Sequence, residues 1–213
     1  YTRDPVGNLT RIQRNGSLDT FEYDELYRLT RASLPGVGSW WFRYDHTGNR
    51  VEMIHNGQTT TYSCDSANCV TTINGVPVEH DANGHVTSVG WGSETYTWDV
   101  RGRLVRLVKG GATYEFQYDP FGLRTGKKAG GVWTYYLLDG ESVVKEITGS
   151  TSTYTTQGPL LDQPLGRGGR YFTPNHLGST TTLTDGSGTV VQSYQYGPFG
   201  ETSQSTGEAN PFQ

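Results

Sequence analysis

The chain has 213 residues and a net charge of −4, and it contains 29 Gly, 29 Thr and 14 Tyr but only four Lys. β-Branched and aromatic residues favour strands and Gly favours turns, so the composition predicts many short strands and excludes a helical bundle. The sequence has neither the basic stripe that nucleic-acid binding requires nor an apolar run of 18 residues that could span a membrane as a helix.

A tandem repeat begins in the first residues, with Asp followed three positions later by Gly. The pairs are Asp4 and Gly7, Asp45 and Gly48, Asp81 and Gly84, Asp99 and Gly102, Asp119 and Gly122, and Asp185 and Gly188. Asp24 and Asp65 hold the same place, with Tyr27 and Asn68 in the Gly position. Successive anchors from Asp4 to Asp139 are 16 to 21 residues apart, which indicates a repeat of about 20 residues.

Apolar side chains flank these turns at fixed positions. The residue before Asp is usually aromatic, and a second ring lies two residues earlier, which places both on one face of a strand. Aliphatic residues follow the turn, so each unit reads as a β-hairpin with an aromatic–aliphatic pair across it. The rings before Asp are Tyr23, Tyr44, Trp98 and Tyr118, and the aliphatic residues are Leu9, Leu29, Val51, Val70, Val86 and Leu104.

The turn residues themselves have a structural explanation. An Asp at the first turn position can accept hydrogen bonds from backbone N–H groups two residues on, and Gly after it suits a positive φ. A Ca²⁺ ladder is the alternative, but each turn offers one carboxylate and Ca²⁺ requires six or more oxygens. Between the Asp turns lie connectors typical of type I′ hairpins: Asn15-Gly16, Asn56-Gly57, Asn74-Gly75, Gly110-Gly111 and Gly130-Gly131. The pattern predicts an up-and-down meander of about eighteen strands.

Two small clusters could carry chemistry. Cys64 and Cys69 flank one turn, and a disulfide between them and two free thiols are equally compatible with this spacing. His80 and His85 flank the next turn with Asp81, a set that could hold a metal but more often consists of polar residues beside a turn. No catalytic motif occurs, so we expect no enzyme activity, no cofactor and no metal.

Residues 148–170 break the repeat. The Thr-rich stretch 148–157 alternates and fits an edge strand or an exposed hairpin, whereas 158–169 is rich in Gly and Pro and is expected to form a loop. The expected organisation is thus tandem hairpin repeats over 1–147, an irregular connection over 148–170 and a closing segment over 171–213.

Residues 21–30, 96–104 and 116–124 resemble the tyrosine-aspartate (YD) repeats of rearrangement-hotspot (Rhs) proteins, toxin-complex C subunits, bacterial wall-associated proteins and teneurins. Residues 171–180, 183–190 and 194–201 are similar to the segment that closes the Rhs core. The family's next block is missing after Asn210-Pro-Phe-Gln213, as is the downstream Asp-Pro-x-Gly pair that cleaves off the toxic tip in many members. Asp119-Pro-Phe-Gly122 looks like half of that pair, but it occupies an ordinary repeat turn.

The resemblance implies a ribbon of antiparallel hairpins, curved as part of a β-cocoon that encapsulates and delivers a toxin domain. It implies a secreted or cell-surface bacterial protein. The expected partners are the enclosed toxin domain and, through open strand edges, neighbouring repeats of a longer chain or copies of this one. The alternative is a filament that self-assembles or contacts glycans through the same edges and aromatic rows.

Overall fold

The computed structural model describes residues 1–14, 16–159, 163–175 and 177–204. These residues form 22 strands, against the expected eighteen or so, and the described pairings are antiparallel. The all-β prediction is confirmed. No stretch of the described chain forms a helix with the length and apolar character needed to cross a membrane. Two compact units are present, one of residues 1–79 and 196–203 and the other of residues 80–195.

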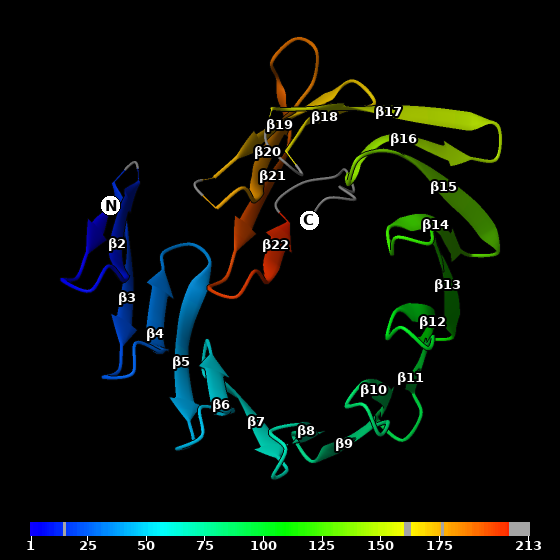
Figure 1. Cartoon of the computed structure of the whole chain (residues 1–213). Helices are drawn as coiled ribbons and strands as arrows, with labels where there is room; N and C mark the ends of the chain where they lie inside the picture. The colour runs from blue at the N-terminus through cyan, green and yellow to red at the C-terminus, as the bar shows by residue number, and fades with distance from the viewer. Residues whose placement is uncertain (15, 160–162, 176, 205–213) are drawn as a thin grey trace. The chain divides into compact units, whose positions relative to one another are not determined.

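In the first unit each strand pairs with the next one along the chain, so sequence order is also spatial order (Figure 1). Its strands are β1 (Thr2–Arg3), β2 (Leu9–Arg14), β3 (Ser17–Tyr23), β4 (Leu29–Leu34), β5 (Gly38–Tyr44), β6 (Arg50–His55), β7 (Gln58–Cys64), β8 (Val70–Ile73) and β9 (Val76–His80).

The second unit repeats this arrangement from β10 to β21. Its strands are β10 (Val86–Val89), β11 (Glu94–Trp98), β12 (Leu104–Lys109), β13 (Ala112–Tyr118), β14 (Arg124–Ala129), β15 (Val132–Asp139), β16 (Ser142–Thr148), β17 (Thr151–Gln157), β18 (Pro164–Arg167), β19 (Arg170–Pro174), β20 (Thr180–Thr184) and β21 (Val190–Tyr196). The last strand, β22 (Thr202–Gln204), begins in the stretch 196–203 that belongs to the first unit.

A one-residue β-bulge follows the Asp turn in each Asp-x-x-Gly hairpin whose register is described. Tyr118 faces Arg124 and Gln117 faces Gly126, so Thr125 is the extra residue. The bulge residues of the first repeats are Thr10, Thr30, Val51 and Thr71, and all are β-branched. This register corrects one assignment, because Tyr44 faces Arg50 and Val51 lies in the bulge rather than across the turn.

The bulge also explains part of the excess of threonine. At several bulges the threonine hydroxyl donates to the backbone carbonyl eight residues earlier, a group on the neighbouring strand where the ladder is interrupted. These bonds join Thr10 to Thr2 at 3.1 Å, Thr30 to Glu22 at 3.1 Å, Thr71 to Ser63 at 3.2 Å and Thr181 to Thr173 at 2.9 Å.

The connectors at the other end of the hairpins adopt the expected type I′ geometry, in which both central residues have positive φ. Asn56 and Gly57 have φ of 49° and 83°, and Asn74 and Gly75 have 51° and 76°. Both residues of Gly110-Gly111 and of Gly130-Gly131 also have positive φ. The Asn15-Gly16 prediction falls partly on Asn15, which lies outside the described residues.

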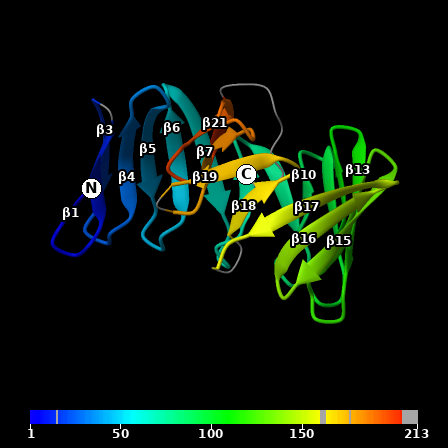
Figure 2. The ribbon, with the colours of Figure 1, turned by 90° about the horizontal axis from the view of Figure 1, so that it is seen from above.

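The best-packed core belongs to the first unit, where β3 to β6 run side by side (Figure 2). Ala32, Leu34, Trp40 and Phe42 are buried there. Phe21 faces Ala32, Ala32 faces Trp40, and Trp40 stacks on His55 with ring centroids 4.4 Å apart. Alternate residues of β5 therefore place one face in the core, while Trp41 on the other face is 40% exposed.

The expected loop over 158–169 is wrong in part. Pro164–Arg167 forms β18, which pairs with both β17 and β19, because Pro164 lies at the strand's first position and needs no ladder hydrogen bond. The boundaries expected at 147/148 and 170/171 stay predictions. His176 and the terminal Asn210-Pro-Phe-Gln213 lie outside the described residues.

Candidate assembly site: the repeat turns and the docked closing turn

Each repeat turn is built around the carboxylate of its Asp, as Asp99 illustrates. One Asp99 oxygen accepts the backbone N–H groups of Arg101 at 2.8 Å and Arg103 at 3.0 Å, and the other accepts the Arg103 guanidinium at 2.7 Å. The Gly102 N–H donates to the Asp99 carbonyl at 3.0 Å, and Gly102 has a φ of 72°. Two backbone donors that the turn would leave free are thus satisfied by one side chain.

The same backbone bonds recur in the other predicted turns, so these residues lie in a series of separate turns rather than in one pocket. The carboxylates of Asp4, Asp24, Asp45, Asp65, Asp81, Asp119 and Asp185 each accept the N–H groups two and four residues on. The Gly of the pairs, namely Gly7, Gly48, Gly84, Gly122 and Gly188, has positive φ, as do Tyr27 and Asn68 in its place. Asp119-Pro-Phe-Gly122 is an ordinary member of this series.

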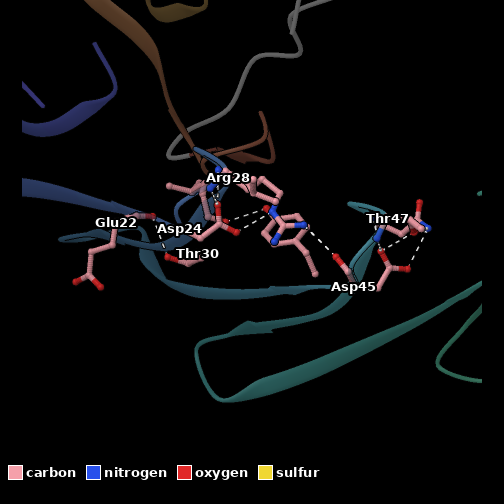
Figure 3. Close-up of polar contacts among 10 residues, drawn as sticks. Glu22, Asp24, Arg28, Thr30, Asp45 and Thr47 are labelled. Atoms are coloured by element: carbon pink, nitrogen blue, oxygen red, sulfur yellow. Dashed lines mark hydrogen bonds and ion pairs between the residues drawn. The ribbon is translucent and has the colours of Figure 1, made fainter. Parts of the chain in front are cut away.

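Two kinds of side chain connect one turn to the next repeat, and the sequence analysis singled out neither role. The Arg28 guanidinium bonds to Asp24 in its own turn at 2.7 Å and donates to the carbonyl of Asp45 in the next turn at 3.0 Å (Figure 3). Arg103 joins Asp99 to the Asp119 carbonyl in the same way. An Arg four residues after the turn Asp is the signal that could have predicted this link.

In four turns the aromatic residue before the Asp supplies the second link. The hydroxyls of Tyr23, Tyr44 and Tyr118 donate to the carbonyls of Leu9, Leu29 and Leu104 in the preceding repeat, at 3.0, 2.8 and 2.8 Å. Trp98 makes the equivalent bond to Val86 through its indole N–H at 2.7 Å. The guanidiniums of Arg28 and Arg103 also lie over the Tyr44 and Tyr118 rings. These repeats are therefore bonded through side chains to their neighbours, in addition to the strand ladder.

The hydrogen bonds lower the pKa of several turn carboxylates. The Thr47 hydroxyl, followed by the Asn49 side chain and backbone, lowers the pKa of Asp45 to about 2. The Arg103 side chain, followed by its backbone N–H, lowers the pKa of Asp99 to about 2. The pKa of Asp81 is lowered chiefly by the bond to the His85 side chain. These groups are favoured as carboxylates because their N–H and O–H donors stabilise the charged form.

The histidine and cysteine clusters occupy ordinary repeat positions. His85 Nδ1 lies 3.0 Å from the Asp81 carboxylate, and the His85 ring stacks on Trp98. In other turns the equivalent position, four residues after the Asp, also bonds to the turn Asp; its residues are Asn8, Arg28, Asn49 and Arg103. Among the described residues no three His, Cys, Asp or Glu gather into a metal site.

Cys64 and Cys69 are half-buried and lie at the two ends of one turn. Burial raises the pKa of the Cys64 thiol, and the carboxylates of Asp45 and Asp65 raise it further, which disfavours the thiolate that disulfide formation needs. The disulfide stays a prediction, which thiol titration of the denatured, non-reduced chain tests.

Two further turns belong to the series although Asp is missing from them. Asn175 accepts the N–H groups of Leu177 at 2.8 Å and Ser179 at 3.1 Å, so Asn175-x-x-Gly178 is a repeat turn that a search allowing Asn for Asp would have found. In Gly197-Pro-Phe-Gly-Glu201 the Asp position is Gly. Here the carboxylate of Glu201 accepts the Phe199 N–H at 3.1 Å and fills the space where a side chain on Gly197 would lie.

This closing turn is docked on the core face of the first unit. The Phe199 ring lies edge-on to Phe42 with centroids 5.0 Å apart. The Arg50 guanidinium is in contact with three rings, at 5.1 Å from Phe199, 5.7 Å from Phe42 and 4.9 Å from Tyr62. Phe42, Arg50 and Tyr62 thus form a receptor for an aromatic turn tip, which we call the Arg50 socket.

Several known proteins are similar to this chain in sequence. The sequence profile of the family described as Teneurin YD-shell matches residues 3–212. The tRNA3(Ser)-specific nuclease WapA of Bacillus spizizenii is 32% identical over 75% of the chain, and Teneurin-1 of Gallus gallus is 24% identical over 87%. The chain spans about 7% of the length of each.

Solved structures show the same fold. The crystal structure of TcdB2-TccC3 without its hypervariable C-terminal region superposes on 95% of the chain with a TM-score of 0.68 and 17% identity. The Tc holotoxin pore of Photorhabdus luminescens also covers 95%, with a TM-score of 0.65 and 19% identity. The chain covers 13% of either solved chain.

Proposed function

Because the chain belongs to the teneurin YD-shell family, we propose that it forms part of the wall of a β-shell that encloses a toxin domain in an exported Rhs-type bacterial protein. Its role in this proposal is structural and not enzymatic. The nuclease activity named for the Bacillus relative is not assigned to this chain, which spans about 7% of that protein. The partners are the adjoining repeats of a longer polypeptide and the enclosed domain.

The observation that carries the proposal is the side-chain bonding between neighbouring repeats within each unit. Arg28 and Tyr44 both cross from one repeat to its neighbour, and Arg103 and Tyr118 do so again in the second unit. A sheet built this way can be lengthened repeat by repeat while each unit contacts only its neighbours, as a long wall requires.

The distribution of buried side chains supports a wall that is completed by other polypeptide. No hydrophobic residue between Val78 and Phe172 is buried within the part of the chain that the structure describes. In that stretch the rings of Tyr114, Phe116 and Tyr136 are only half-buried. A single layer of sheet cannot shield both of its faces from water, so one face is covered by the domain inside the shell.

The test uses the longer protein that carries this segment together with its downstream domain. Limited proteolysis of the intact protein should leave that domain protected, and Trp40→Asp, which places a charge in the buried core, should make it cleavable under the same conditions. Trp91→Asp is the matched control, because Trp91 is 78% exposed and its replacement should leave protection unchanged. Cleavage of the domain in the unaltered protein at the rate of the free domain would refute encapsulation.

The alternative function, a filament or adhesive layer, rests on the turn tips. The third position of several turns holds an apolar side chain that is more than half exposed and could contact other molecules. These residues are Val6, Leu26, Phe121 and Leu177. Sedimentation of the isolated chain over a range of concentrations separates the two roles. Fibres or a growing polymer would favour the filament and contradict the simple wall.

A further inference from the structure

The Arg50 socket has an equivalent in the second unit. Counting from Asp45, its residues lie at −3, +5 and +17, and counting from Asp119 the same positions hold Phe116, Arg124 and Tyr136. The Arg124 guanidinium lies 5.9 Å from the Phe116 ring and 5.5 Å from the Tyr136 ring. Among all the Asp-x-x-Gly turns of the sequence, and those with Tyr27 or Asn68 in the Gly position, only these two have Arg at +5.

The two sockets differ in what covers them. In the first, Phe199 lies against Phe42 and Arg50, and Phe42 is only 5% exposed. In the second, Arg124 is exposed and Phe116 is half-buried, and no third ring contacts Arg124 among the described residues. The second socket therefore has the residues that receive a turn tip, and no described residue takes the place that Phe199 has in the first socket.

Charge indicates what kind of turn fits. Lys127 faces Phe116 at the position that Met53 holds opposite Phe42, and its ammonium lies over the Tyr114 ring. The second socket is thus more cationic than the first. The docked turn in the first unit carries an acidic residue, Glu201, directly after its final glycine.

We propose that Phe116, Arg124 and Tyr136 form a second docking site, which binds an aromatic-tipped Pro-Phe-Gly turn with an adjacent acidic residue, presented by a partner segment. The partner's ring packs on Arg124 and Phe116, as Phe199 packs on Arg50 and Phe42. Its carboxylate lies near Arg124 and Lys127, which compensate its charge. The inference concerns binding by this chain alone, so it can fail while encapsulation holds, and the reverse.

The probe is a fluorescent peptide of residues 193–203, cyclised through added terminal cysteines so that the turn is formed before it binds. Fluorescence anisotropy with the full 213-residue chain should show saturable binding. Arg124→Met should weaken that binding at least tenfold. Arg106→Met is the matched control, because Arg106 pairs with Glu115, points to the opposite face of the sheet and should leave the affinity within twofold.

Several outcomes overturn the proposal. The first is that the peptide does not bind to the unaltered chain. The second is that a peptide carrying Phe199→Ala binds equally well. The third is that Arg50→Met abolishes binding and Arg124→Met does not, which would place the peptide in the first socket. Self-association of the chain that Phe121→Ala abolishes would assign the second socket to another copy instead, and would equally overturn it.

Discussion

At the scale of single residues, the carboxylate of a turn Asp joins donors from its own turn, and through Arg it is connected to the next repeat. Asp99 satisfies two backbone donors and one guanidinium, and the guanidinium then reaches the next repeat. Asn175 makes the two backbone bonds without a charge. A side-chain oxygen without a charge is therefore enough for the two backbone bonds of the turn.

The lowered pKa values of Asp45 and Asp99 predict how stability depends on pH. Both carboxyls have a folded-state pKa of about 2 against an ordinary 3.8, so their contribution is complete above pH 4 to 5 and is lost as the pH falls towards 2. We expect the denaturant midpoint to fall over that range. Asp45→Asn with Asp99→Asn should flatten the fall, and a fall as steep as in the unaltered chain would show that other groups are responsible.

Tyr27 is a position where the sequence departs from its own pattern at a cost. It has a φ of 62°, a region that disfavours side chains, and it is 59% exposed, so little packing opposes its removal. Tyr27→Gly should raise the free energy of unfolding by about 0.5–1 kcal/mol, measured by urea denaturation. Asn68→Gly, at the same turn position, should gain less because Asn tolerates this region. A lower free energy of unfolding for Tyr27→Gly would show that the positive φ of Tyr27 does not strain the folded chain.

At the scale of the hairpin, the Asp turn and the bulge after it form one unit. The turn residues were readable from the sequence because Asp, Gly and the flanking ring recur at fixed spacing. The bulge is not predictable from the sequence. An extra residue changes the cross-strand pairing of side chains but leaves the spacing of the Asp residues unchanged. For that reason the repeat pattern predicts Val51 at the position opposite Tyr44, which Arg50 occupies in the structure.

The bulge threonine offers a direct test. Thr30→Val keeps the β-branched shape but removes the hydroxyl that donates to the Glu22 carbonyl, so it should cost about 0.5–1 kcal/mol of unfolding free energy. Thr59→Val, on an exposed strand position, is the control and should cost less than 0.5 kcal/mol. Equal effects of the two substitutions would mean that the bulge hydroxyl has no special role.

At the scale of the whole chain, the contact that sequence reasoning could not find joins residues far apart. The region around residue 199 resembles a family closing segment, but no local sequence pattern predicts that the Phe199 ring contacts Arg50 and Phe42. Such a contact depends on where the backbone returns, which spacing within a repeat does not encode. The half of the site formed by the turns was therefore predictable, and the docked half was not.

The two Pro-Phe-Gly turns provide a matched pair for this long-range contact. Phe199→Ala should lower the unfolding free energy by about 1–2 kcal/mol, because it removes a ring pair and a cation–π contact. Phe121→Ala, at the tip of the other turn with 91% exposure, should change it by less than 0.5 kcal/mol. Denaturation of both variants measures this, and similar losses would show that the docking contributes nothing.

The links from Arg28 to the Asp45 carbonyl and from Tyr44 to the Leu29 carbonyl end on backbone atoms, which every residue type possesses. These two bonds consequently place no demand on the side chain of the residue that accepts them. At the level of the gene, unequal crossing-over between repeats would add or delete whole units and leave the remaining bonds in place. The number of repeats then changes between related proteins while the bonds between neighbouring repeats stay the same.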